Sequence, residues 1–264
     1  MSNSVLVFDS GLGGLTVLAR MRRLMPDLDC LYVADDAGFP YGAYEDRTLT
    51  CHVVQTVSRL IAAHRPRLVV IACNSASTLV LPHLRARHAL SFVGTVPAIK
   101  PAAAATRSGL VSVLATPGTV ARDYTRALIR DHAAGVSVTL VGAAGLAGIA
   151  EARMAGAMAD PAAVAAEIAP AFVAADGGRT DTVVLACTHY PLLIAELRRA
   201  APWPVTWIDP APAIARRVRH VAGSAADGRA GKGTCRFIAT SGADIAARAA
   251  ATLAWLIDTA DADL

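Results

Sequence analysis

The chain has 264 residues, of which 54% are hydrophobic and 17% are charged. This composition excludes an intrinsically disordered protein, and the length is sufficient for one large domain or two smaller ones. The formal net charge of +4 is too small to indicate a nucleic acid partner, although it slightly favours small anionic ligands. The N-terminus lacks the features of a signal peptide, and no apolar run reaches the roughly 18 residues of a membrane span. We therefore expect a cytoplasmic protein without a membrane partner.

Short apolar runs alternate along the chain with longer segments of helical pattern. The runs that we expect to be strands are 5–8, 30–33, 68–71, 111–114, 136–141, 183–185 and 205–208. The clearest helical segments between and after them are 15–25, 46–64, 77–88, 124–130 and 245–257. Continuous runs of Val, Ile and Leu are typical of strands covered on both faces, as in parallel sheets. The alternation therefore predicts an α/β fold.

The strand and helix pattern runs through the chain twice. VLVFDSGLGG (5–14) opens one series and VSVLATPGTV (111–120) opens another, while VVIACNSAS (69–77) in the first resembles VVLACTHYP (183–191) in the second. We expect two α/β domains of similar topology, the first from residues 1–97 plus 208–264 and the second from 98–207. The Gly/Ala-rich stretch 223–233 is expected to be a loop.

The five cysteines do not indicate a disulfide framework or a metal site. Their number is odd and no C-x-x-C spacing occurs. Two of them, Cys73 and Cys187, end apolar runs and are followed by residues that begin helices. A helix N-terminus lowers the pKa of a thiol from about 8.5 towards neutrality. Two such thiols on opposite sides of one cleft could remove a proton from one face of a carbon and return it on the other, which is the chemistry of a racemase or epimerase.

Other polar residues lie close to these two cysteines in the predicted elements. Asp9 ends the first strand and could share a proton with Cys73, although capping of the next helix explains it equally well. His189 follows Cys187 by two residues and is a natural partner for thiol proton transfer. The GLGG turn after Asp9 lacks the lysine of a nucleotide-binding loop, so we expect it to hold an anion. Glu151, in a segment of small residues, reads on its own as a helix carboxylate that pairs with Arg153 or with nothing.

Six segments, DSGLGGLTVL, PYG, ACNSAS, ATPGTV, ACTHYP and IDPAPAIARRV, occur here in the order and spacing of glutamate racemases, and the chain resembles that family over most of its length. The resemblance implies two pseudo-symmetric α/β domains with the active site in the cleft between them. It also implies that Cys73 and Cys187 are the catalytic acid/base thiols, assisted by Asp9, His189 and Glu151. The positions expected to contact substrate, including two threonines of the second unit, are Ser10, Tyr41, Gly42, Asn74, Ser75, Thr116, Thr119 and Thr188.

The resemblance further implies that no cofactor or metal is used and that the substrate is glutamate. The product, D-glutamate, would supply peptidoglycan synthesis in a bacterial host, and a homodimer is possible because family members dimerise in more than one way. By the same analogy, Cys73 would deprotonate D-glutamate and Cys187 L-glutamate.

Two other functions fit the residues without the resemblance. A one-thiol enzyme of the same fold, such as a decarboxylase or an amide hydrolase, would need only one of the two cysteines and would form a covalent intermediate. A binding protein that uses the cleft to hold an anion would need neither thiol and would catalyse no exchange of an α-proton.

Overall fold

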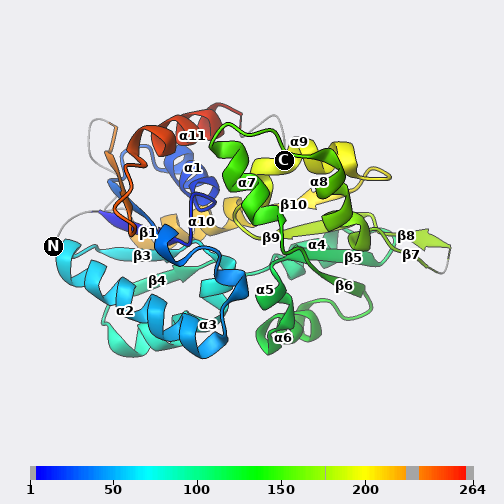
Figure 1. Cartoon of the computed structure of the whole chain (residues 1–264). Coiled ribbons are helices and arrows are strands. Elements are labelled where there is room, and N and C mark those ends of the chain that lie inside the picture. Colours follow the sequence, from blue (N-terminus) through cyan, green and yellow to red (C-terminus); the bar gives the residue numbers. More distant parts are fainter. Residues whose placement is uncertain (1–3, 176, 224–231, 260–264) are drawn as a thin grey trace.

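Two parallel β-sheets form the centre of the molecule (Figure 1). The computed structural model describes residues 4–175, 177–223 and 232–259. The first sheet has the order β11-β2-β1-β3-β4, with β1 (Val5–Asp9), β2 (Cys30–Ala34), β3 (Leu68–Ile71), β4 (Ser91–Gly94) and β11 (Cys235–Ala239). The second has the order β10-β9-β5-β6, with β5 (Leu110–Ala115), β6 (Ser137–Gly142), β9 (Thr182–Ala186) and β10 (Thr206–Ile208). The antiparallel pair β7 (Ala174–Ala175) and β8 (Gly178–Arg179) is separate. The predicted α/β class with two parallel sheets is confirmed.

The two sheets repeat one topology. The order β2-β1-β3-β4 in the first matches β6-β5-β9-β10 in the second, so β1 corresponds to β5 and β3 to β9. Cys73 follows β3 and Cys187 follows β9, and the two thiols therefore lie at equivalent points of the two sheets. This correspondence gives the repeated Ala-Cys motif a structural meaning, since each copy ends the same strand of its own sheet.

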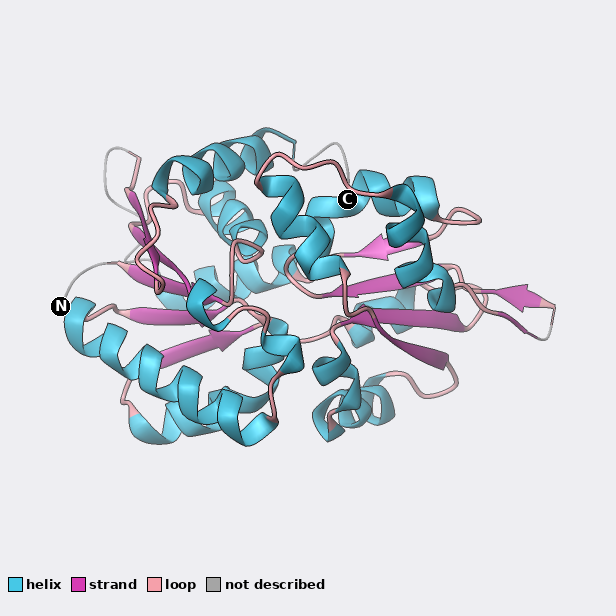
Figure 2. Cartoon of the chain, in the orientation of Figure 1, coloured by secondary structure: helices cyan, strands magenta, loops and turns pink. Residues whose placement is uncertain are grey.

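Helices cover both faces of each sheet (Figure 2). Successive residues of the strands belong to the hydrophobic clusters on opposite faces. On the first sheet, Val5 and Val7 face α1 (Leu15–Leu24), α10 (Ala211–Ala222) and α11 (Ala246–Thr259), whereas Leu6 and Phe8 face α2 (Asp46–His64) and α3 (Asn74–Arg87). The second sheet carries on one face α7 (Leu146–Met154), α8 (Pro161–Ile168) and α9 (Ile194–Ala200). On its other face lie α4 (Ile99–Ala105) and α6 (Asp123–His132).

Shorter helical turns connect these elements. They are η1 (Asp36–Gly38), η2 (Tyr41–Ala43), α5 (Pro117–Ala121), η3 (Ala169–Ala171) and η4 (Tyr190–Leu193). In the described part of the chain, no helix is long and apolar enough to cross a membrane.

Several boundaries differ from the sequence prediction. Helix α3 begins at Asn74 rather than at residue 77, because Cys73 occupies the N-cap position and the helix follows it directly. Cys187 is followed by the 3-10 turn η4 before α9, and not directly by an α-helix. Strand β10 extends to Ile208, which pairs with Val184 of the second sheet. We propose that the parts of the chain around the first and the second sheet are two domains, which we name the first and second domain, and that the first domain resumes after Ile208. Most of the loop expected at 223–233 lies outside the described residues.

Candidate active site

Residues from the carboxyl ends of both sheets line one cavity between them. In parallel α/β sheets this is the edge at which ligands bind. The free volume at its centre is about 20 Å³, close to the room that one water molecule needs. The lining residues are Ser10, Phe39, Pro40, Tyr41, Gly42, Cys73, Asn74, Ser75, Thr116, Ala147, Cys187, Thr188 and His189. Both cysteines and seven of the eight expected substrate contacts are therefore here, and Thr119 is not in the lining.

Cys73 enters the cavity from the first domain as a buried thiol. Its Sγ lies 3.7 Å from Oγ of Ser10. Burial raises the pKa of Cys73 to about 12, and the negative charge of Asp9 adds to this effect, whereas the backbone N–H of Ala76 acts in the opposite direction. The expectation that the helix N-terminus makes this thiol acidic is therefore wrong. Desolvation and a neighbouring carboxylate outweigh the helix end.

Asp9 is fully buried and joins the two domains. Its carboxylate accepts hydrogen bonds from the backbone N–H of Gly11 and from the hydroxyl of Thr188, both at 3.1 Å. Burial raises the pKa of Asp9, although the charge of His189 and the hydrogen bonds oppose this rise. Asp9 is thus a carboxyl group whose proton affinity exceeds that of an exposed aspartate, close to Cys73.

Cys187, His189 and Glu151 form a chain of polar contacts in the second domain. Sγ of Cys187 lies 3.9 Å from Nδ1 of His189, and Nε2 of His189 lies 2.9 Å from Oε1 of Glu151. Burial lowers the pKa of His189, but the hydrogen bonds to Cys187 and Glu151 outweigh it and raise the pKa to about 10. The raised pKa favours the protonated imidazole, although Nε2 also lies 3.2 Å from the backbone N of Gly13. Glu151 does not pair with Arg153, whose Nε instead donates to Glu196 at 2.7 Å.

The GLGG turn holds an anion that belongs to the protein itself. The backbone N–H of Leu12 donates to Oε1 of Glu151 at 2.6 Å. A Cβ atom at Gly13 would lie 2.4 Å from Nδ1 of His189, and a Cβ at Gly11 would lie 2.3 Å from Oε1 of Glu151. Only glycine allows this close approach, so the turn from the first domain seats the His189–Glu151 pair of the second.

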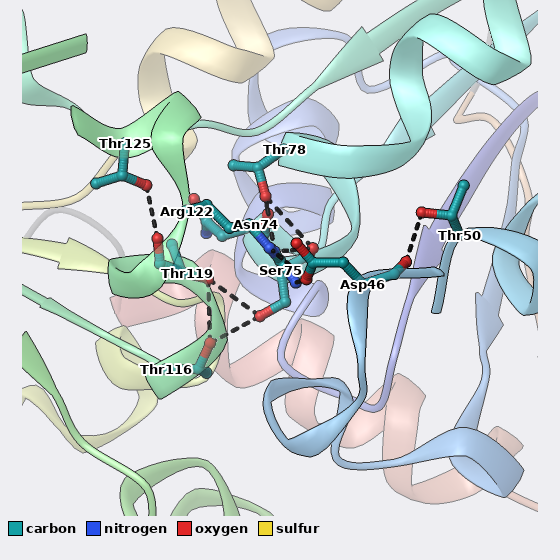
Figure 3. A network of polar contacts seen from close by, with 9 residues as sticks. All are labelled: Asp46, Thr50, Asn74, Ser75, Thr78, Thr116, Thr119, Arg122 and Thr125. Atoms are coloured by element: carbon teal, nitrogen blue, oxygen red, sulfur yellow. Dashed lines mark hydrogen bonds and ion pairs between the residues drawn. The ribbon is translucent and has the colours of Figure 1, made fainter. Parts of the chain in front are cut away.

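A cluster of hydroxyl groups forms another wall of the cavity (Figure 3). Oγ of Ser75 lies 2.8 Å from Oγ1 of Thr116 and 3.2 Å from Oγ1 of Thr119, and the two threonine oxygens are 3.0 Å apart. Beside them, the buried amide of Asn74 has no hydrogen-bond partner for either Nδ2 or Oδ1. A buried amide without a protein partner is costly, so Asn74 is suited to bind a polar ligand in the cavity.

Tyr41 and Gly42 lie in the cavity wall in different ways. The hydroxyl of Tyr41 donates to the buried carboxylate of Asp35, which also contacts the ring of His52 and accepts from Thr240 Oγ1 at 2.6 Å. The Tyr41 hydroxyl is therefore engaged within the first domain, although Tyr41 is among the expected substrate contacts. A Cβ at Gly42 would lie 2.8 Å from Cβ of Thr116, so glycine allows the two domains to touch here.

Sequence reasoning missed Asp35 and Phe39. Asp35 directly follows β2, just as Asp9 ends β1, so the rule that singled out a carboxylate at the end of a strand could have found it. Phe39, whose ring lies 5.5 Å from that of His189, carries no such signal. Among the described residues, no group of three or more His, Cys, Asp or Glu is arranged to hold a metal ion.

Comparison with known proteins agrees with this geometry. The family model for Asp/Glu/hydantoin racemases matches residues 15–218. The glutamate racemase of Brucella canis is 60% identical over 218 residues, which cover 82% of this chain and 79% of that protein. A crystal structure of Escherichia coli glutamate racemase with L-glutamate and the activator UDP-MurNAc-Ala has a TM-score of 0.85 and 36% identity, covering 97% and 96% of the two chains. A glutamate racemase isoform of Bacillus anthracis has a TM-score of 0.79 and 25% identity, covering 96% and 94%.

Proposed function

Because the chain belongs to the Asp/Glu/hydantoin racemase family, among its glutamate racemases, we propose that Cys73 and Cys187 interconvert L- and D-glutamate without a cofactor. The observation that carries this proposal is the position of the two thiols. They follow equivalent strands, β3 and β9, of two sheets with one topology, and both line a single cavity. A carbon held between them has one thiol on each face.

In the proposed reaction, the α-carbon of glutamate loses one proton and gains another. A thiolate on one side takes the α-proton of glutamate, and the thiol on the other side gives its proton to the opposite face of the same carbon. The product has inverted configuration, and the two sulfur atoms have exchanged protonation states. In the reverse direction the two groups exchange roles. By analogy with the family, Cys187 serves as base for L-glutamate and Cys73 for D-glutamate.

The surroundings of the two thiols differ. Nδ1 of His189, whose pKa is raised to about 10, lies 3.9 Å from Sγ of Cys187, and Nε2 of the same ring lies 2.9 Å from Oε1 of Glu151. Cys73, whose pKa is raised to about 12, remains a thiol. Asp9, which is buried close by, assists proton transfer at Cys73. Cys73 is thus suited to give a proton to the α-carbon when L-glutamate is the substrate.

Neutral polar groups would bind the substrate. We propose direct contacts with Ser10, Gly42, Asn74, Ser75, Thr116 and Thr188, and a contact with the ring of Tyr41 rather than with its hydroxyl, since Asp35 already accepts from that group. Thr119 contributes through its bonds to Ser75 and Thr116. Because the free volume is about 20 Å³, the domains must separate for glutamate to enter.

The product would serve peptidoglycan synthesis. The relative from Escherichia coli was crystallised with UDP-MurNAc-Ala as its activator, and this nucleotide-linked muramic acid supports a link between such enzymes and cell-wall precursors.

The test is to replace each thiol separately. Cys73→Ala and Cys187→Ala should each lower the rate of racemisation by at least about 10²- to 10⁴-fold, since each removes an acid/base group. The rate is measured by polarimetry with L- and with D-glutamate. If only one cysteine matters and a covalent adduct accumulates, the enzyme uses one thiol. Wild-type protein that binds glutamate without exchanging its α-proton would contradict catalysis altogether.

A further inference from the structure

Arg122 is a buried cation located where the two domains meet. It lies between α5 and α6 of the second domain, and only 5% of its surface is exposed. Among the described residues, no other arginine or lysine belongs to the buried group. A buried arginine is costly to desolvate unless its donors are used, so its partners define what it does.

The hydrogen-bond and ion-pair partners of the Arg122 side chain shown in Figure 3 belong to the first domain. Its NH1 donates to the backbone carbonyl of Ser75 and to Oγ1 of Thr78 at 2.7 Å, so it binds the first turn of α3. Its Nε and NH2 each lie 3.1 Å from Oδ1 of Asp46, the first residue of α2. The guanidinium thus connects the second domain to two helices of the first.

The hydroxyl cluster continues this contact to the cavity. The same Ser75 whose carbonyl accepts from Arg122 meets Thr116 and Thr119 through its side chain. Thr119 is fixed in turn, because its carbonyl accepts from Oγ1 of Thr125 at 2.6 Å. Arg122 therefore helps to hold the N-terminal turn of α3 in contact with the start of α5. This turn carries Asn74 and Ser75.

The charge of Arg122 is only partly neutralised. The side chain of Asp46 is 56% exposed, so water screens its interaction with the arginine. Among the described residues, none that lines the cavity is an arginine or a lysine, although glutamate brings two carboxylates. The Arg122 guanidinium lies directly behind this wall, and its positive charge acts on Ser75 and Thr116.

We propose that Arg122 is a positioning residue that assembles the carboxylate-binding wall of the closed site from Asn74, Ser75, Thr116 and Thr119. The inference rests on the proposed racemisation of glutamate and adds to it the group that closes the two domains around the substrate. Arg122 does not touch the reacting carbon, and its effect is on substrate binding.

The experiment compares Arg122→Gln and Arg122→Lys with the control Arg126→Gln. Arg126 lies four residues further along, is half-exposed, and pairs with Asp123 within α6. We expect Arg122→Gln to raise KM for glutamate by about 10- to 100-fold, the loss expected for charged hydrogen bonds, with a much smaller change in kcat. Arg122→Lys keeps the charge but loses the planar guanidinium, so its KM should lie between those of wild type and Arg122→Gln. Arg126→Gln should match wild type.

A second readout does not depend on activity. Amide hydrogen exchange in Arg122→Gln should be faster than in wild type for peptides covering 74–78 and 116–122, with the rest of the chain unchanged. A folded Arg122→Gln protein with wild-type KM and wild-type exchange would overturn the inference. If Arg122→Gln does not fold, KM and amide hydrogen exchange of Arg122→Lys test the inference in its place. Wild-type protein that fails to racemise glutamate would contradict the proposed function, while hydrogen exchange would still test the role of Arg122 in closure.

Discussion

The imidazole of His189 and the carboxylate of Glu151 are joined by a 2.9 Å contact between Nε2 and Oε1, and a glycine turn from the other domain covers both. The pair depends on the two domains being closed, because Leu12 donates to Glu151 and Gly13 leaves space for His189. The environment of the His189 ring, whose Nδ1 faces Sγ of Cys187, is thereby linked to the contact with this turn.

Removing the charge of Glu151 should weaken the base at Cys187. In Glu151→Gln the imidazolium loses its carboxylate, and the pKa of His189 should fall below its present value of about 10. We expect kcat/KM to decrease by about 10- to 100-fold, as for a lost hydrogen bond to a charged group. Because the equilibrium constant of a racemisation is one, this decrease must be equal in both directions. Primary isotope effects measured from each enantiomer then show which deprotonation has slowed.

The matched control is Glu196→Gln, which removes the partner of Arg153 outside the cavity. It should leave kcat/KM and the pH profile unchanged. Equal decreases of kcat/KM in Glu151→Gln and Glu196→Gln would show that Glu151 acts only through the stability of the fold.

The glycine at position 13 should not tolerate even a methyl group. In Gly13→Ala the new Cβ would lie 2.4 Å from His189, and overpacking of this kind costs about 1–3 kcal/mol of unfolding free energy. Racemisation should also slow, since His189 must move. Gly148→Ala, on α7 with no atom within 4 Å of the added Cβ, should be neutral or stabilising by up to about 1 kcal/mol. Urea unfolding and kcat of the two variants measure the effects on stability and on racemisation. A Gly13→Ala protein with wild-type stability and rate would contradict the proposed close packing of Gly13 against His189.

The buried thiol of Cys73 should make the fold sensitive to alkaline pH. Its pKa rises from the ordinary 9.0 to about 12 in the folded state, so the folded protein keeps a proton that the unfolded chain has lost. This contribution to stability is complete below pH 9 and decreases as the pH rises towards 12, by up to about 1.4 kcal/mol per pH unit. Urea unfolding between pH 8 and 11 should show a shallower decline for Cys73→Ala than for wild type. Cys51→Ala, which removes an exposed thiol, should keep the wild-type slope.

The sequence predicted the parts of the molecule that depend on local pattern. Continuous apolar runs predicted the parallel strands, and the repeated Ala-Cys ending predicted that both cysteines follow strands of the sheets, where residues at the carboxyl ends of parallel strands gather at one edge. Features that depend on the surroundings were missed. The helix end after Cys73 is real, but the pattern does not reveal that burial and Asp9 reverse its effect on the thiol.

Long-range partners were equally hidden. Nothing in ATPGTVAR distinguishes Arg122 from an exposed arginine, because its burial arises from α2 and α3 of the other domain. The anion expected at the GLGG turn proved to be Glu151, 139 residues from Leu12 along the chain. Tyr41 donates to Asp35, a carboxylate that directly follows β2, and the Pro-Tyr-Gly pattern carries no signal of this partner.

The most direct test of the two-thiol account follows hydrogen at the α-carbon. Unlabelled L-glutamate is given to the wild-type protein in deuterated water without added cofactor, and the reaction is stopped after a few per cent conversion. If one thiol removes the proton and the other delivers a solvent-derived deuteron, the D-glutamate formed carries deuterium while the recovered L-glutamate keeps protium, and the same holds from D-glutamate. Product that retains protium, or deuterium appearing equally in substrate and product, would contradict the account, because a single group would then be removing and returning the proton.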